Sequence, residues 1–136
     1  MRLSTRSRYS TRLILELAKK YDQGPIYLKD ISNSQEISLK YLGQLIIPLK
    51  IAGLIKSTRG AHGGYFLSKA PDKIRLSDIV VAVEGPLFLL ECLENSDICN
   101  RSDICEVREF WKVINDKFYR SLEDITIKDI LDRSKS

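Results

Sequence analysis

The feature that most constrains this sequence is a helical pattern over residues 38–52, followed directly by a β-hairpin pattern over residues 54–67. Apolar residues in the first part repeat every three or four positions, as in a helix with one buried face. These positions are Leu39, Leu42, Leu45, Ile46 and Leu49. Ser38 suits the N-cap position of this helix, and Gly53 suits the position at which the helix ends. The basic, glycine-rich turn RGAHGG joins two short extended runs, so this stretch predicts a winged helix-turn-helix.

Polar and basic side chains in this stretch indicate a nucleic-acid interface. The helix would enter the major groove, while the hairpin, or wing, brings an arginine to a minor groove. Glycines in the wing allow a tight turn and a close approach of the backbone to DNA. Tyr41 suits packing or a phosphate contact as well as the reading of a base, and His62 suits a surface position near phosphate better than metal binding. We expect DNA contacts from Ser38, Lys40, Tyr41, Gln44, Lys50, Arg59, Gly60, His62 and Gly63.

The charge distribution supports the same interpretation. Residues 1–75 carry 14 Lys and Arg against 5 Asp and Glu, a net charge of +9, whereas residues 76–136 carry 8 against 13, a net charge of −5. The positive half contains the helix and the wing. A basic region that coincides with a DNA-binding pattern is the electrostatic signature of a protein that binds duplex DNA.

The hydrophobic pattern of the whole sequence predicts a mainly α fold with a small β-wing. We expect a winged helix-turn-helix domain over residues 1–84, a cysteine-containing loop over 85–105, and a dimerisation helix with a C-terminal helix over 104–136. Within the first domain, residues 1–21 and 28–33 suit helices, and residues 26–28 suit a short strand that pairs with the wing. Pro48 suggests a kink in the helix that reads DNA. Ser77 suits the N-cap of a helix over residues 78–83.

The helical period returns at Ile104 with a large aromatic face. Its members are Val107, Phe110, Trp111, Ile114, Phe118 and Leu122. Because this face is large for so small a domain, we expect a helix that pairs two copies of the chain. Thr126 suits the N-cap of a last short helix over residues 127–131.

Three cysteines, Cys92, Cys99 and Cys105, fall within fourteen residues. Their spacing differs from that of zinc fingers, but three thiolates suit a soft metal or an iron–sulfur cluster. The alternative is three buried thiols that act as small apolar side chains. The polar residues around Cys92 and Cys99 favour metal or redox chemistry.

Other features of the sequence indicate the cellular compartment of the protein. The odd cysteine count argues against a secreted disulfide framework. The first ten residues are charged and lack a hydrophobic signal region, and no apolar run approaches the length of a membrane span. We therefore expect a cytoplasmic protein without a membrane partner.

Nearly the whole chain resembles the Rrf2-type iron–sulfur cluster regulators, a family of bacterial winged-helix repressors that includes IscR-, NsrR- and CymR-like members. The matching stretches are MRLSTRSRYS, GPIYLKDIS, ISLKYLGQLIIPLKIAGLIKSTRGAHGGYFLSKAP, LSDIVVAVEGP, the cysteine loop and ITIKDIL. The resemblance implies a homodimer with crossing C-terminal helices that binds a partly palindromic operator. It also implies that Cys92, Cys99 and Cys105 hold an iron–sulfur cluster, with 2Fe–2S the expected form.

The sequence departs from the family at two places. Some members supply a fourth cluster ligand from a histidine three residues after the third cysteine, and others from an acidic residue in the first helix. Arg108 and Arg8 stand at these positions here, which leaves Asp103, Glu106, Glu109 or the partner chain as candidates. The family also includes members with a glutamate at the position of Gly43, which has no side chain for a base contact, whereas Gln44 can read adenine.

Two competing functions share this fold. One is a cluster-free repressor whose cysteines respond to oxidants or to cysteine metabolism, and the other is a winged-helix protein-interaction module. The sequence contains no nucleophile–base pair, phosphate-binding loop or pair of carboxylates that suits catalysis. We therefore expect neither an enzyme nor a small-molecule substrate.

Overall fold

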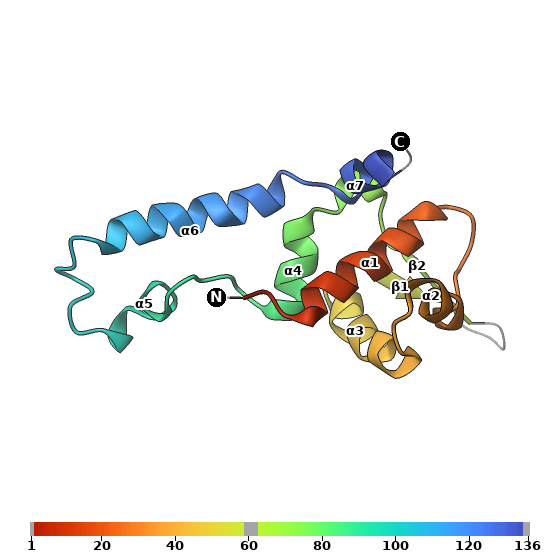
Figure 1. Ribbon diagram of the computed structural model, residues 1–136, viewed down its shortest axis with the longest axis horizontal. Coiled ribbons are helices and arrows are strands. Elements are labelled where there is room, and N and C mark those ends of the chain that lie inside the picture. Colours follow the sequence, from red (N-terminus) through yellow and green to blue (C-terminus); the bar gives the residue numbers. More distant parts are fainter. Residues whose placement is uncertain (1, 59–62, 135–136) are drawn as a thin grey trace.

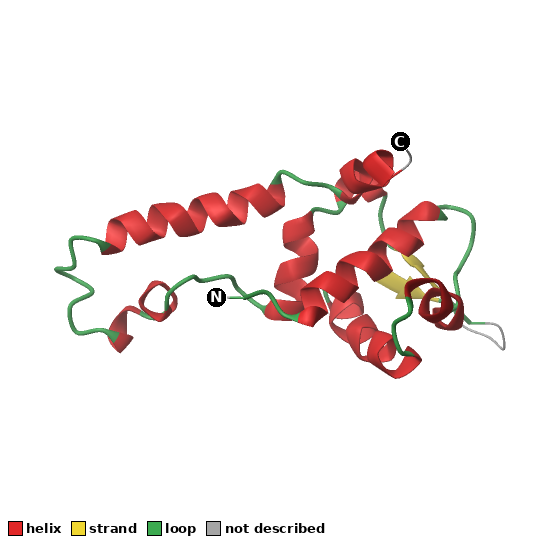
Figure 2. Cartoon of the chain, viewed as in Figure 1, coloured by secondary structure: helices red, strands yellow, loops and turns green. Residues whose placement is uncertain are grey.

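The computed structural model describes residues 2–58 and 63–134. Helices dominate these residues, and the two strands form a single antiparallel hairpin (Figure 2). The elements are α1 (Thr5–Lys19), α2 (Leu28–Gln35), α3 (Leu39–Ile51), β1 (Ile55–Ser57), β2 (Tyr65–Leu67), α4 (Leu76–Glu84), α5 (Glu91–Glu94), α6 (Arg108–Glu123) and α7 (Ile127–Ser134), with short 3₁₀ turns at Pro71–Lys73 and Ser96–Ile98. The expected fold, a winged helix-turn-helix with a long C-terminal helix, is confirmed.

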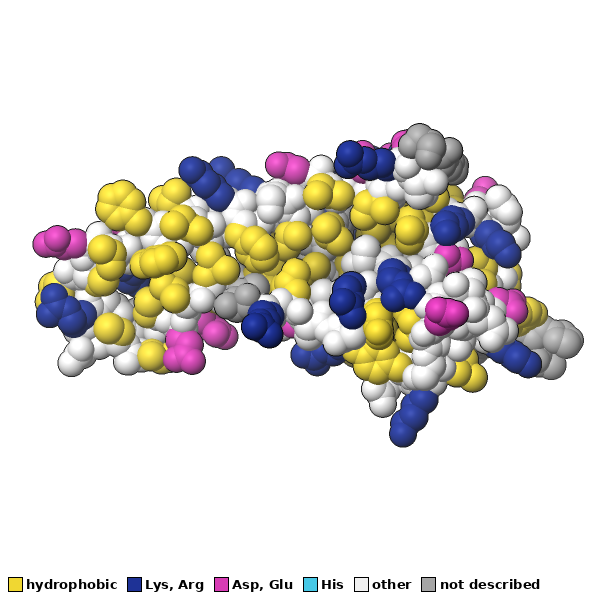
Figure 3. Space-filling view, in the orientation of Figure 1, with side chains coloured by type: hydrophobic (Ala, Val, Ile, Leu, Met, Phe, Trp, Pro, Cys, Tyr) yellow, Lys and Arg dark blue, Asp and Glu magenta, His cyan; other side chains and the backbone are white. Residues whose placement is uncertain are grey.

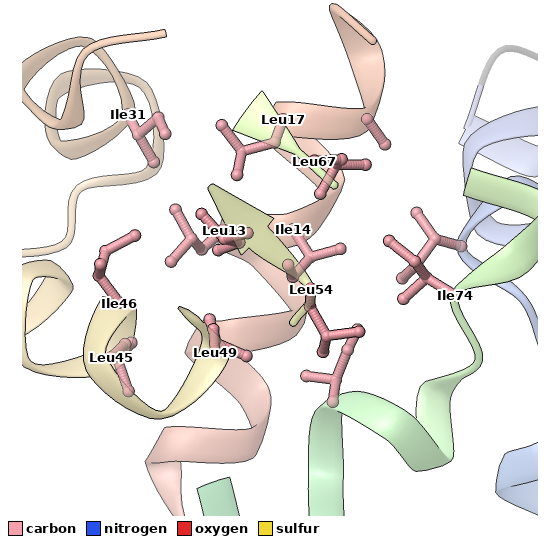
Figure 4. Packing of buried hydrophobic residues seen from close by; sticks show 14 of the residues in the cluster. Leu13, Ile14, Leu17, Ile31, Leu45, Ile46, Leu49, Leu54, Leu67 and Ile74 are labelled. Carbon is pink, nitrogen blue, oxygen red and sulfur yellow. The ribbon is translucent and has the colours of Figure 1, made fainter. Parts of the chain in front are cut away.

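One part of the molecule, called the head here, is formed by α1–α4, the hairpin and α7. Apolar faces of α1 and α3 meet at its centre, where Leu13 and Ile14 lie opposite Leu45 and Leu49 (Figure 4). Ile127 joins the same core from α7. The last helix of the chain therefore packs on the head.

A second part of the molecule extends away from the head. It consists of α6 and of the cysteine loop, residues 85–107, which leaves α4 and returns beside α6 (Figure 1). A small cluster of Val80, Leu87 and Leu122 joins α4, the loop and α6 where this arm begins. No helix in the described ranges is long and apolar enough to span a membrane.

Several element boundaries differ from the sequence-based expectation. The pairing of residues 26–28 with the wing is reduced to one bridge, in which Ile26 and Tyr65 exchange two backbone hydrogen bonds of 2.8 Å. Helix α4 begins before Ser77, which is buried in the first turn, because the Asp78 carboxylate accepts the hydrogen bond from the Arg75 backbone N–H (2.9 Å). Ser77 is therefore not the cap. Helix α3 includes Pro48 and ends at Ile51, and the kink expected at Pro48 stays a prediction.

Candidate nucleic-acid interface and cysteine loop

The N-terminus of α3 is fixed by Ser38. Its hydroxyl oxygen accepts a hydrogen bond from the Tyr41 backbone N–H (3.1 Å), as expected of an N-cap. Leu42, Leu45, Ile46 and Leu49 turn into the core, which leaves the opposite side of the helix in solvent. That exposed side carries Ser38, Lys40, Gln44 and Lys50. The helix therefore presents a polar and basic surface from a rigid support.

Tyr41 lies apart from this polar surface. Its ring is half-buried and packs edge-on against Tyr9 of α1, with ring centroids 5.7 Å apart. The guanidinium groups of Arg8 and Arg12 lie 5.3 and 5.2 Å from the centre of the Tyr9 ring, within cation–π range. Tyr41 thus connects the start of α3 with two arginines of α1.

These arginines extend the basic surface from α3 onto α1. Arg12 is held in place because it donates hydrogen bonds to the side chain and the backbone carbonyl of Gln35, at the end of α2. Arg8 remains exposed. Neither arginine was among the DNA contacts expected from the sequence. Because α1 and α3 are far apart in the sequence, the sequence alone did not show that these arginines lie near Tyr41. The arginines of the first helix did indicate a basic surface there.

The wing is closed by contacts between Thr58 and Gly64. The Thr58 N–H donates to the Gly64 carbonyl (2.9 Å), and the Gly64 N–H donates to the Thr58 hydroxyl (2.8 Å). A Cβ atom at Gly64 would approach the Ile26 carbonyl and Pro25 to 3.0 Å, so this close packing favours glycine. Of the predicted wing contacts, Gly63 is exposed, whereas Arg59, Gly60 and His62 lie outside the described residues.

Lys50 links α3 with the wing. Its ammonium group donates a 3.0 Å hydrogen bond to the Ser57 hydroxyl on β1. Both residues are exposed, so the contact leaves the charge accessible to a phosphate. Helix and wing therefore form one continuous surface at this point.

The cysteine loop is anchored to α6 at two points. The buried Asn115 side chain accepts a hydrogen bond from the Leu89 N–H (2.6 Å) and donates one to the Leu87 carbonyl (3.1 Å). Nearer the tip of the arm, the Arg108 guanidinium donates to the Cys92 carbonyl (3.2 Å). Since Arg108 stays protonated in proteins, it is a donor here and cannot serve as a metal ligand.

The three cysteines are free thiols, and no two of them form a disulfide. Cys92 and Cys105 are half-buried and Cys99 is exposed. Within residues 2–58 and 63–134, no three His, Cys, Asp or Glu side chains are close enough to hold a metal ion. Three thiols are nevertheless the donor set that iron–sulfur clusters use. The donors fit such a cluster in kind, and binding it requires the loop to take another path.

Glu84 connects the start of this loop with the head. It is the last residue of α4, and its carboxylate accepts hydrogen bonds from the Ser4 N–H (2.9 Å), the Ser4 hydroxyl and the Ser7 hydroxyl (2.8 Å). Gly85 follows with a φ of +83°, a conformation that favours glycine. A change in the path of the loop therefore begins at a residue fixed to α1.

Comparisons with known proteins agree with this architecture. Residues 3–133 match the model of a family described as "Rrf2: Iron-dependent Transcriptional regulator". The HTH-type transcriptional regulator CymR of Bacillus subtilis is 41% identical over 96% of this chain and 89% of its own length. The HTH-type transcriptional regulator IscR of Erwinia tasmaniensis is 33% identical over 99% of this chain and 81% of its own length.

A solved structure extends the similarity to three dimensions. The structure of CymR (YrzC), the global cysteine regulator of B. subtilis, matches with a TM-score of 0.80 at 39% identity. The match covers 98% of each chain, so it includes the head, the cysteine loop and α6 together.

Proposed function

This chain belongs to the Rrf2 family of transcriptional regulators, and from that premise we propose that it is a homodimeric repressor whose cysteine loop controls its affinity for operator DNA. The DNA-binding part of this proposal rests on the solvent-exposed side of α3. A helix capped by Ser38 presents Lys40 and Gln44 to solvent beside the wing, on the positively charged half of the chain. This arrangement suits a helix that enters the major groove.

A second copy of the chain is proposed as the partner of α6. Large apolar side chains gather over α6 and the adjoining loop (Figure 3). Phe110 is 71% exposed and Trp111 is 43% exposed, and Ile114 and Val113 are exposed beside them. An apolar surface of this kind is typical of an interface between subunits.

For the sensor we propose an iron–sulfur cluster held by Cys92, Cys99 and Cys105, with a fourth ligand from outside this trio. Such a cluster supplies a centre that responds to oxidants and to the availability of iron. The chain's own contribution is the loop between Glu84 and Arg108. Moving Cys99 toward Cys92 and Cys105 would change the path of the loop at its contacts with Asn115 and Glu84. The packing of α4 against α6 would change with it. Through α6, that change reaches the spacing of the two heads in a dimer.

A cluster-free thiol regulator is the second candidate. It is favoured by the similarity to CymR, which is described as a global cysteine regulator, and by three free thiols that form no metal-binding group in the described part of the chain. In that case oxidation would join cysteines in a disulfide without iron. A protein-interaction module fits less well, because it gives no reason for the positive charge around α3.

The salt dependence of DNA binding tests the proposed interface. A contact between Lys40 and a phosphate releases condensed counterions, so Lys40→Ala should weaken binding and reduce the slope of log affinity against log salt concentration by about one. Lys128→Ala, which removes an exposed charge on α7, serves as the matched control and should leave the slope unchanged. An equal slope for the wild type and Lys40→Ala would show that Lys40 does not contact a phosphate.

A further inference from the structure

The exposed side of α3 changes character halfway along the helix. Ile47 is 60% exposed and Ile51 is 83% exposed, whereas Leu45, Ile46 and Leu49 are turned into the core (Figure 4). With 3.6 residues per turn, both exposed isoleucines fall on the side of the helix that carries Lys40 and Gln44. An apolar surface therefore continues the polar surface of α3 toward its C-terminus.

Gly43 leaves space beside this apolar surface. A Cβ atom at Gly43 would meet nothing within 4 Å, so no packing contact in the head requires a glycine there. Glycine in an exposed helix costs about 1 kcal/mol relative to alanine. Ile47 lies four residues, about one turn, after this open position, and helical side chains lean toward the N-terminus. Ile47 therefore lies next to the open space at Gly43, on the side of the helix that carries Gln44.

We propose that Ile47 determines operator specificity by contacting the C5-methyl group of a thymine in the major groove, next to an adenine that Gln44 reads. The inference rests on the proposed function of α3 as the reading helix. Thymine alone presents a methyl group in that groove, and apolar side chains select it, while glutamine pairs with adenine. The helical rise separates Ile47 from Gln44 by about 4.5 Å along the axis, close to the step of about 3.4 Å between base pairs.

Charge favours DNA over a protein as the occupant of this surface. Lys40 and Lys50 are exposed at the two ends of the helix, and the surrounding half of the chain has a net charge of +9. A protein partner seated on Ile47 would also have to cover Lys40 and Gln44, which costs free energy unless each polar group finds a partner. The edges of base pairs and the phosphates supply both kinds of partner.

Removal of single methyl groups from the DNA tests the contact. Operator duplexes are first selected from a random pool with the full-length protein, and each thymine of the selected site is then replaced by deoxyuridine. We expect one position in each half-site at which the wild type loses about fourfold in affinity, the effect of one methyl group removed from an apolar contact. Ile47→Ala should bind the thymine and deoxyuridine duplexes equally at that position, and Ile47→Val should retain part of the difference.

Ile51→Ala is the matched control. It shortens a second exposed isoleucine about 6 Å further along the helix, and it should keep the wild-type ratio at the position assigned to Ile47. Alanine favours helix formation, and Ile47 is exposed, so thermal unfolding should confirm that both alanine variants fold.

The possible results separate this inference from the proposed function. If no duplex is selected from the pool, DNA binding itself is wrong and the inference fails with it. If a site is selected but no deoxyuridine effect depends on Ile47, the inference alone fails. If Ile47→Ala instead weakens self-association in sedimentation and leaves the deoxyuridine profile unchanged, the surface is a protein interface and the inference is overturned.

Discussion

Glu84 is the residue that ties the cysteine loop to the head. Its carboxylate is partly buried, which raises its pKa, but the hydrogen bonds from Ser4 and Ser7 outweigh this effect and leave the pKa lowered overall. A carboxylate whose pKa is lower in the folded state stabilises the fold at pH values above its ordinary pKa. That stabilisation is lost as the pH falls through the folded-state value. Glu84 should therefore stabilise the junction at neutral pH and release it in acid.

Glu84→Gln tests this role. The amide still accepts hydrogen bonds but lacks the charge, so the free energy of unfolding at pH 7 should fall by about 1 kcal/mol. The difference from the wild type should shrink as the pH drops below about 4.5, the ordinary glutamate value. Chemical denaturation at several pH values measures it. Glu91→Gln, at an exposed position in the loop, is the control, and a pH-independent difference for Glu84→Gln would refute the assignment.

At the scale of elements, the sequence predicted those whose signals are local. The cap at Ser38, the apolar period of α3 and the glycines of the turn all lie within a few residues of the structure that they specify. Thr126 likewise caps α7 as expected, since its hydroxyl accepts from the Asp129 N–H (3.1 Å) and the Asp129 carboxylate accepts from the Thr126 N–H (2.9 Å). Local side-chain to backbone bonds of this kind can be read from spacing alone.

The start of α6, which the sequence analysis misplaced, involves a contact between residues far apart in the sequence. The apolar period from Ile104 predicts an earlier start for the dimerisation helix, but α6 begins at Arg108. Before it, the chain forms turns, in which the Ile104 N–H bonds the Arg101 carbonyl and the Arg108 N–H bonds the Cys105 carbonyl. The Arg108 side chain also reaches back sixteen residues to Cys92. Periodicity contains no information about such a contact.

The apolar face of α6 gives the prediction at this scale. Trp111→Glu places a charge in the proposed interface, where its burial would be costly, so the wild type should sediment as a dimer and the variant as a monomer at micromolar concentration. Lys112→Glu changes the charge at an exposed position on the side of the helix away from Phe110 and Ile114, and this variant should remain dimeric. A monomeric wild type, or a dimeric Trp111→Glu variant, would refute α6 as the interface.

At the scale of the whole molecule, the head and the arm meet along α4, at whose start the Arg75 guanidinium donates a hydrogen bond to the Glu123 carbonyl (2.7 Å). The cluster of Val80, Leu87 and Leu122 and the hydrogen bonds of Glu84 both lie where the cysteine loop leaves α4. The sequence indicated three cysteines in a polar loop, but their spacing could not predict that they form no metal-binding group in the described residues, because the path of the loop depends on its contacts with α6. The loop that carries the cysteines is therefore joined both to the end of α4 and to α6.

The most direct test of the central claim compares operator binding with and without a cluster. Protein purified without oxygen is assayed for iron and sulfide, and its affinity for the selected operator is measured before and after the cluster is removed. The wild type should contain stoichiometric iron and sulfide, and the two affinities should differ at least about fivefold, the lower end of typical allosteric coupling. Cys99→Ala should show no such difference. Iron-free protein, or equal affinities in the wild type, would contradict control of DNA binding by a cluster on the cysteine loop.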